Sequence, residues 1–139
     1  FIQTTFLETL SFFKLFEMIW KSFLRFRKII ILFDKVFLIF DIADPSTPKL
    51  QAKLVDKRLG KPNRCVVCGN RAYLPMVEGN GVAVLDISDA RKPKFLMSFR
   101  DPVLLKKTYG VAVRDNLLFV ASREGNSLVI LDRHALENK

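Results

Sequence analysis

The sequence predicts an all-β fold of repeated antiparallel sheets, each with four short strands, preceded by an N-terminal amphipathic α-helix. The main observation is an apolar run that ends in aspartate and occurs three times, at Asp41, Asp86 and Asp132. These aspartates are 45 and 46 positions apart, and a period of about 40–50 residues is typical of folds that repeat a small sheet. Turn residues give a second observation, because glycine and proline are absent before Pro45 and recur at intervals after it.

The composition is that of a folded globular domain. The chain has 139 residues, of which 50% are hydrophobic and 27% are charged, so it has enough apolar side chains for a core. Its net charge of +9 favours acidic partners in general. The basic residues are spread along the whole chain, however, and no nucleic-acid partner is expected.

Residues 1–28 are expected to form an aromatic, basic amphipathic helix. Charged residues within 5–28 recur every three or four positions, as on one helical face: Lys14, Glu17, Lys21, Arg25 and Lys28. These charges interrupt every apolar run, which argues against a transmembrane span or a signal peptide. We favour a helix that packs on the following domain. Two other roles stay open: contact of residues 5–28 with an anionic membrane surface, and a fragment boundary without an evolved role.

From Ile29 onward the pattern changes to that of β-strands. Hairpin turns are expected at equivalent places in three copies, at residues 34–35, 78–80 and 123–126. Each hairpin follows another strand, and in the first two copies a polar turn and an outer strand come after it. The repeats are therefore expected at about 29–56, 64–101 and 110–139, within one unit of 29–139.

These strands resemble the LVIVD repeat, in which an apolar strand ends in aspartate and enters an Asp-Pro-Ser-x-Pro-like turn. The resemblance rests on LVILD at 128–132, VAVLDISD at 82–89, FLIFDIADPSTP at 37–48 and the preceding strand pair YGVAVRDNLLFVAS at 109–122. Two departures are visible. Ala90 stands where proline is expected, and Arg133-His134 replaces the second apolar-Ser-Asp step.

The resemblance implies β-propeller blades that carry no fixed catalytic set. Known propellers have about 4–8 blades, and only about two and a half repeats of this length are present. We therefore expect an incomplete propeller, a fragment whose remaining blades belong to a longer parent chain. The resemblance also points to an extracellular or cell-surface location, although the residues themselves do not decide the compartment.

Cys65 and Cys68 form a CxxC pair, which can indicate redox or metal chemistry. A structural zinc site needs four ligands, but the sequence has two cysteines and one histidine, His134. Positions three apart in a strand also point to opposite faces. We therefore interpret both cysteines as structural and predict no metal, cofactor or catalytic residues.

Asp41, Asp86 and Asp132 are the recurrent polar residues of the repeat. One carboxylate per blade at one height would suit a cation site. We favour structural turn caps, in which each carboxylate accepts hydrogen bonds from backbone N–H groups of the following turn.

Two functions from different classes follow from this pattern. The first, which we favour, is a non-enzymatic scaffold that binds another protein or a ligand through blade loops such as the basic segment 57–61. The alternative is part of a propeller-type enzyme, metal-dependent or not, whose active site lies largely in other blades.

Overall fold

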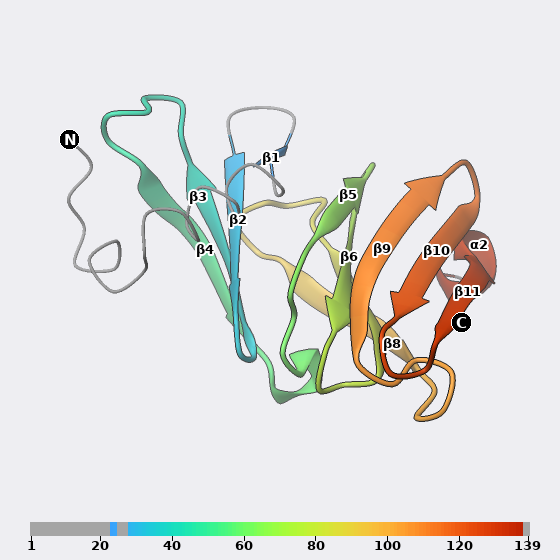
Figure 1. Ribbon diagram of the computed structural model, residues 1–139. Coiled ribbons are helices and arrows are strands. Elements are labelled where there is room, and N and C mark those ends of the chain that lie inside the picture. Colours follow the sequence, from blue (N-terminus) through green and yellow to red (C-terminus); the bar gives the residue numbers. More distant parts are fainter. Residues whose placement is uncertain (1–22, 25–27, 138–139) are drawn as a thin grey trace.

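The computed structural model describes residues 23–24 and 28–137, which form three antiparallel sheets side by side (Figure 1). The first sheet contains β1 (Phe23–Leu24), β2 (Lys28–Phe33), β3 (Val36–Asp41) and β4 (Lys49–Val55). The second contains β5 (Val66–Cys68), β6 (Arg71–Met76), β7 (Gly81–Asp86) and β8 (Lys94–Arg100). The third contains β9 (Thr108–Arg114), β10 (Leu117–Ser122) and β11 (Ser127–Asp132). A 3-10 turn, η1 (Lys57–Leu59), and a short helix, α2 (Arg133–Glu137), complete the described elements.

The all-β prediction is confirmed, with sheets of three or four strands that pair antiparallel in chain order. Hairpins join the second and third strands of each sheet at the expected places, and their left-handed residues are Lys35, Asn80 and Asn126. Asparagine tolerates this conformation more readily than most residues. The described sheets do not close into a ring (Figure 1).

The predicted N-terminal helix is wrong where the structure describes that region. Phe23–Leu24 is strand β1, with Phe23 opposite Ile29 and Leu24 opposite Lys28. Strand β2 offers an unpaired edge, and pairing with the preceding chain satisfies its backbone groups. The rest of the predicted helix, and with it the proposed membrane contact, lies outside the described residues. Within the residues that the structure does describe, no helix is long and apolar enough to cross a membrane.

The cross-strand register is the same in all three sheets. Each repeat aspartate ends its third strand, opposite the first residue of the second strand: Lys28 with Asp41, Arg71 with Asp86 and Leu117 with Asp132. Two positions along, Ile30 faces Ile39, Tyr73 faces Val84 and Phe119 faces Ile130. Each sequence repeat therefore forms a sheet with the same pairing between its second and third strands.

Two apolar cores lie between neighbouring sheets. The first core joins the facing sides of the first and second sheets, and the second core joins the second and third. In β6, Leu74 contributes to the first core and Tyr73 to the second, because successive side chains point to opposite faces. The second sheet is thus covered on both faces, which explains why β7 is an unbroken apolar run up to Asp86.

A leucine from the connection between sheets completes each core. Leu59 of η1 is fully buried in the first core and Leu105 in the second. An aspartate begins each connection. Asp56 accepts a hydrogen bond from the backbone N of Arg58, and Asp101 accepts from that of Leu104. The role of this second recurring aspartate was not predicted from the sequence, although the 45-residue spacing of the pair could have revealed it.

Candidate functional site

The three repeat aspartates lie at the ends of β3, β7 and β11, where each accepts backbone hydrogen bonds from the segment that follows. Oδ1 of Asp41 accepts from the N of Ala43 at 2.8 Å, and Oδ1 of Asp86 accepts from the N of Ser88 at 2.9 Å. In the third sheet the donor is the backbone N of the residue three positions after Asp132, at 3.2 Å. The contribution of these bonds to stability stays a prediction.

Each repeat aspartate also meets a polar group from the neighbouring strand or turn, which sequence reasoning missed. Lys28 Nζ lies 2.7 Å from Asp41 Oδ2, and Arg71 Nη1 lies 3.1 Å from Asp86 Oδ1. These pairs follow from the shared register, which places the cation directly across the strand pair. Aligning the repeats by their aspartates would have placed Lys28 and Arg71 at nearly the same position.

The third sheet reaches a similar arrangement with a neutral partner. Leu117 occupies the cation's register position, and Asn116 Nδ2 donates to Asp132 Oδ1 at 2.7 Å instead. The pKa of Asp132 is lowered mainly by the backbone hydrogen bond from Ala135, and that of Asp86 mainly by the one from Ser88. These carboxylates are therefore charged acceptors at neutral pH.

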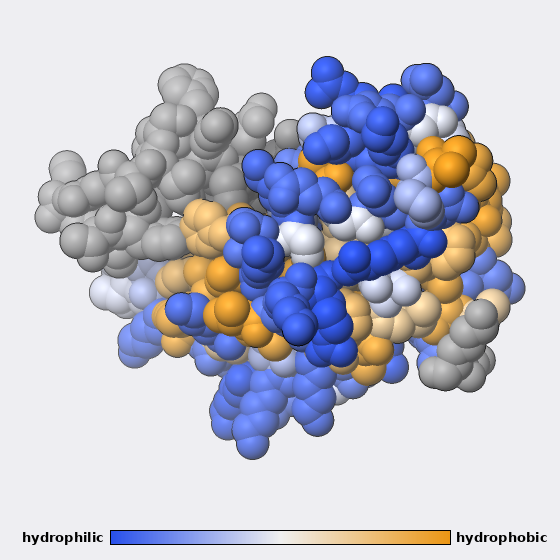
Figure 2. Space-filling model, turned by 90° about the horizontal axis from the view of Figure 1, so that it is seen from below, coloured by the Kyte–Doolittle hydropathy of each residue, from blue (hydrophilic) through white to orange (hydrophobic). Residues whose placement is uncertain are grey.

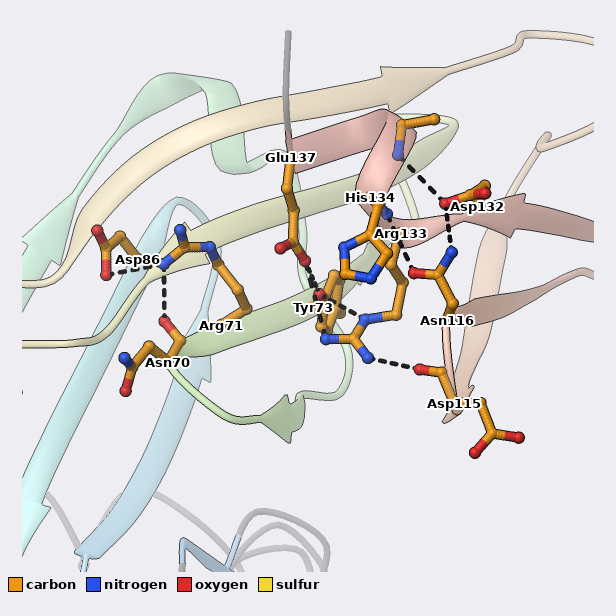
Figure 3. A network of polar contacts seen from close by, with 11 residues as sticks. Asn70, Arg71, Tyr73, Asp86, Asp115, Asn116, Asp132, Arg133, His134 and Glu137 are labelled. Carbon is orange, nitrogen blue, oxygen red and sulfur yellow. Dashed lines mark hydrogen bonds and ion pairs between the residues drawn. The ribbon is translucent and has the colours of Figure 1, made fainter.

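A second polar cluster joins α2 to the second sheet (Figure 3). The Tyr73 hydroxyl donates to Glu137 Oε1 and accepts from Arg133 Nε at 2.9 Å. Arg133 also donates from Nη1 to the carbonyl oxygen of Asp115 at 2.7 Å. The sequence showed Arg133 only as a departure from the repeat; the structure shows that α2 stands where the other sheets have a polar turn.

Tyr73 is suited to anchoring rather than to proton transfer. Its side chain is fully buried in the second core, beside Leu136 of α2. Burial, together with the hydrogen bond to Glu137, raises the pKa of Tyr73 to about 12. The phenol therefore stays protonated at neutral pH and holds α2 against the second sheet.

At the opposite end of the sheets, residues 101–107 and the turn 123–126 form a joint surface that we call the loop platform. Figure 2 shows this end of the molecule, where hydrophilic side chains surround apolar patches. Val103 is 74% exposed and Leu104 is 49% exposed. Lys106 is exposed beside them, with Nζ 3.2 Å from Glu124 Oε2.

The backbone of the loop platform is held by hydrogen bonds at both ends. Asp101 Oδ1 accepts from the N of Val103 at 2.9 Å and from the N of Leu104 at 2.8 Å. Lys107 O accepts from the N of Arg123 at 3.1 Å. Gly125 lies so close that a Cβ there would stand 2.3 Å from the Leu104 carbonyl oxygen. The apolar pair is thus presented by a fixed loop.

The basic segment 57–61, singled out in the sequence as a binding loop, lies at the same end of the first and second sheets. Arg58 makes an ion pair with Asp56, with Nη2 2.5 Å from Oδ2. Its guanidinium carbon also lies 4.0 Å from the centre of the Phe95 ring. These contacts give Arg58 a structural role. Lys57 and Lys61 are exposed.

The CxxC pair is divided between the two cores, as strand alternation predicts. Cys65 is buried in the first core and Cys68 packs against the second. Burial raises the pKa of the Cys65 thiol to about 12, so it is not a reactive thiolate at neutral pH. Among the described residues, no three His, Cys, Asp or Glu side chains are grouped closely enough to hold a metal ion. His134 is exposed on α2.

Comparison with known proteins finds both a repeat family and solved structures that are similar to this chain. Residues 30–55, 60–101 and 106–132 match the LVIVD repeat. The fold is similar to the crystal structure of a functionally unknown protein from Desulfotomaculum acetoxidans DSM 771, with a TM-score of 0.53 and 12% sequence identity. That match covers 78% of this chain but only 42% of the other, so this chain spans less than half of it. No curated protein sequence matches at a significant level.

Proposed function

Since the chain belongs to the LVIVD-repeat family, we propose that it is a non-enzymatic scaffold that binds another protein through loops at one end of its sheets. In this proposal the three sheets are consecutive blades of a β-propeller. The blades supply rigidity, and their loops supply the contact surface.

The main support for this proposal is that the loop platform exposes Val103 and Leu104 while hydrogen bonds to Asp101 hold their backbone in place. Binding removes water from exposed apolar side chains, which is favourable. Because the loop is already held in place, binding costs little further conformational entropy. The hydrogen bonds from Asp101 thus prepare the loop for contact.

The charges around the platform favour an acidic partner. The platform contains three basic residues, Lys106, Lys107 and Arg123, and two acidic residues, Asp101 and Glu124, so it is basic by one charge. The guanidinium carbon of Arg123 lies 5.8 Å from the centre of the Tyr109 ring, so an aromatic side chain adjoins the turn 123–126. A partner with acidic residues around an apolar side chain would match this pattern.

The test compares partner capture by three versions of the protein in its native cell extract. The variant Val103→Ser/Leu104→Ser removes the apolar pair, and Leu96→Ser is the matched control, since Leu96 is 42% exposed on β8, outside the platform. We expect one captured protein to be reduced about tenfold with the double variant and unchanged with the control. Equal capture by all three would contradict the proposal.

Metal analysis separates this function from the alternative of a metal-dependent propeller enzyme. Protein purified without chelators is expected to contain no stoichiometric transition metal. A bound metal at one ion per chain, retained by the Val103→Ser/Leu104→Ser variant, would favour the enzyme.

A further inference from the structure

The outer edge of β11 distinguishes the third sheet from the other two. In those sheets the third strand pairs on both sides, β3 with β2 and β4, and β7 with β6 and β8. Among the described residues, β11 pairs only with β10. The turn that leads to a fourth strand elsewhere is replaced by α2, which Tyr73 and the buried Leu136 hold on the second sheet. The backbone groups on the outer side of β11 are therefore open to a partner strand.

The side chains of β11 do not protect this edge. Outer strands of natural sheets usually carry charges that discourage further pairing. Strands β4 and β8 follow this rule, since each contains two basic residues. Strand β11 has the sequence SLVILD, in which Asp132 is the only charged residue. Leu128 is 63% exposed and Ile130 is 55% exposed. An unprotected apolar edge of this kind suits the addition of a strand from another polypeptide.

We propose that the outer edge of β11 binds an extended segment of a partner protein, which adds to the third sheet as an antiparallel strand. This contact surface is distinct from the loop platform, and binding here does not depend on the exposed apolar pair of the platform. The register of β4 and β8 indicates which side chains such a segment needs. In both strands a lysine lies opposite the repeat aspartate, Lys49 opposite Asp41 and Lys94 opposite Asp86.

Apolar residues follow this lysine one, three and five positions later in both β4 and β8. In β8 the last two are Met97 and Phe99, which lie opposite the β7 residues equivalent to Ile130 and Leu128. Directly opposed side chains on neighbouring strands contact each other. A partner segment with the same spacing would therefore cover Ile130 and Leu128.

The surroundings of Asp132 favour a basic residue at the start of the segment. Asp41 and Asp86 each have a cation opposite them on the second strand, whereas Asp132 has Leu117. Neutral groups, Asn116 Nδ2 and the backbone N of Ala135, donate to its carboxylate. A lysine of the partner would supply the missing positive charge. Strand β11 of a second copy could not, because it contains no basic residue.

The test uses a fluorescein-labelled peptide with the sequence of residues 92–101, which contains β8, and measures its binding to the 139-residue chain by fluorescence anisotropy. Leu128→Ser/Ile130→Ser in the chain is expected to weaken binding about tenfold or more. Leu117→Ser is the matched control, because Leu117 lies on the same outer face of the sheet, the face turned away from the second core, but on β10. It should leave the affinity unchanged. Hydrogen exchange should show protection of backbone N–H groups in β11 by the peptide.

Variants of the peptide test the same contacts without any change in the protein. The peptide variant Met97→Ser/Phe99→Ser should bind about tenfold more weakly. The peptide variant Lys94→Gln and the protein variant Asp132→Asn should each weaken binding, and their effects should not add if the two groups meet.

Four outcomes would overturn the proposal. The first two are no binding of the β8 peptide, and equal binding of its Met97→Ser/Phe99→Ser variant. An equal loss of affinity with Leu117→Ser would place the peptide on the outer face instead of beside β11. A concentration-dependent dimer of the chain, dissociated by Leu128→Ser/Ile130→Ser, would identify a second copy as the occupant.

Discussion

The carboxylate at the end of each third strand holds two neighbours at once, the backbone beyond it and a side chain beside it. Asp86 illustrates this, since it accepts from the N of Ser88 and pairs with Arg71. The interpretation as a turn cap thus extends to a cross-strand contact. Because the same register recurs at Asp41, the contact is a property of the repeat.

Replacement of Asp86 by alanine is expected to lower the free energy of unfolding by about 1–2 kcal/mol, the usual effect of losing a partly buried hydrogen-bond acceptor. Urea denaturation at neutral pH measures this change. Asp34→Ala is the control: Asp34 is exposed, its partner Lys35 is 3.8 Å away, and little change is expected. Full stability of Asp86→Ala with loss of a bound cation would instead indicate a cation site.

The pH dependence of the stability of Asp86→Ala tests whether the charge of the Asp86 carboxylate stabilises the folded state. The pKa of Asp86 is lowered in the folded state, chiefly by the Ser88 hydrogen bond. A lowered pKa adds stability above the unfolded value of about 3.9, and this stability is lost as the pH falls through the folded pKa. The difference between wild type and Asp86→Ala should therefore shrink below about pH 4. A constant difference would contradict a role for the charge.

Tyr73 makes an opposite prediction at alkaline pH. Its pKa is raised to about 12, so the folded state loses stability as the pH rises from about 10 toward 12. In Tyr109→Phe, Tyr73 is the only tyrosine, and tyrosinate absorbance should remain absent until near that upper value. Circular dichroism of the same samples reports whether the chain is folded. A midpoint near 10 in folded protein would contradict the buried position of the hydroxyl.

At the scale of elements, the connections between sheets have two roles. Each buries a leucine in a core, Leu59 or Leu105, and each presents exposed residues at the end of the sheets. In the loop platform, residues 101–107 lie against the turn 123–126. This contact depends on Gly125, whose missing side chain leaves room for the Leu104 carbonyl group.

Gly125→Ala is expected to displace residues 101–107 from the turn. The added Cβ would lie 2.3 Å from Leu104 O and 2.6 Å from Ser122 Oγ, and overpacking of this kind costs about 1–3 kcal/mol. Limited digestion with trypsin should cleave after Lys106 or Lys107 several-fold faster than in wild type. Gly110→Ala is the control, because its Cβ would approach only the Ala121 Cβ, at 3.3 Å. Equal cleavage of both variants would show that the platform does not depend on Gly125.

The whole molecule is an array in which each apolar core joins only neighbouring sheets. The second sheet has both faces covered, and the third leaves its outer face open. Adjacent residues on one strand can therefore contribute very different amounts to the free energy of unfolding. Leu118 is fully buried in the second core, whereas Leu117 is 41% exposed.

Leu118→Ala is expected to lower the free energy of unfolding by about 2–5 kcal/mol, because it removes buried apolar contacts and leaves a cavity. Leu117→Ala, one position away on the same strand, should have a small effect. Chemical denaturation of both variants gives the comparison. Similar losses at the two positions would mean that the outer face is covered in solution.

The sequence by itself determined the repeat, the strands and the turns of the described region. Alternation of side chains within a strand and the turn preferences of glycine and asparagine are local properties, so the hairpins at 78–80 and 123–126 could be predicted. The same alternation predicted that Cys65 and Cys68 would separate. The position of Asp86 at the end of its strand followed from the repeat as well.

Only the tertiary structure decided which side chains meet across strands and sheets. The pairing of Arg71 with Asp86 depends on register, and the cluster of Tyr73, Arg133 and Glu137 joins positions about 60 residues apart along the chain. Strand β1 replaced part of a predicted helix because the edge of β2 offers hydrogen bonds that helical periodicity cannot reveal. Such contacts arise from three-dimensional packing, which brings distant residues together and leaves apolar side chains such as Leu128 and Ile130 exposed.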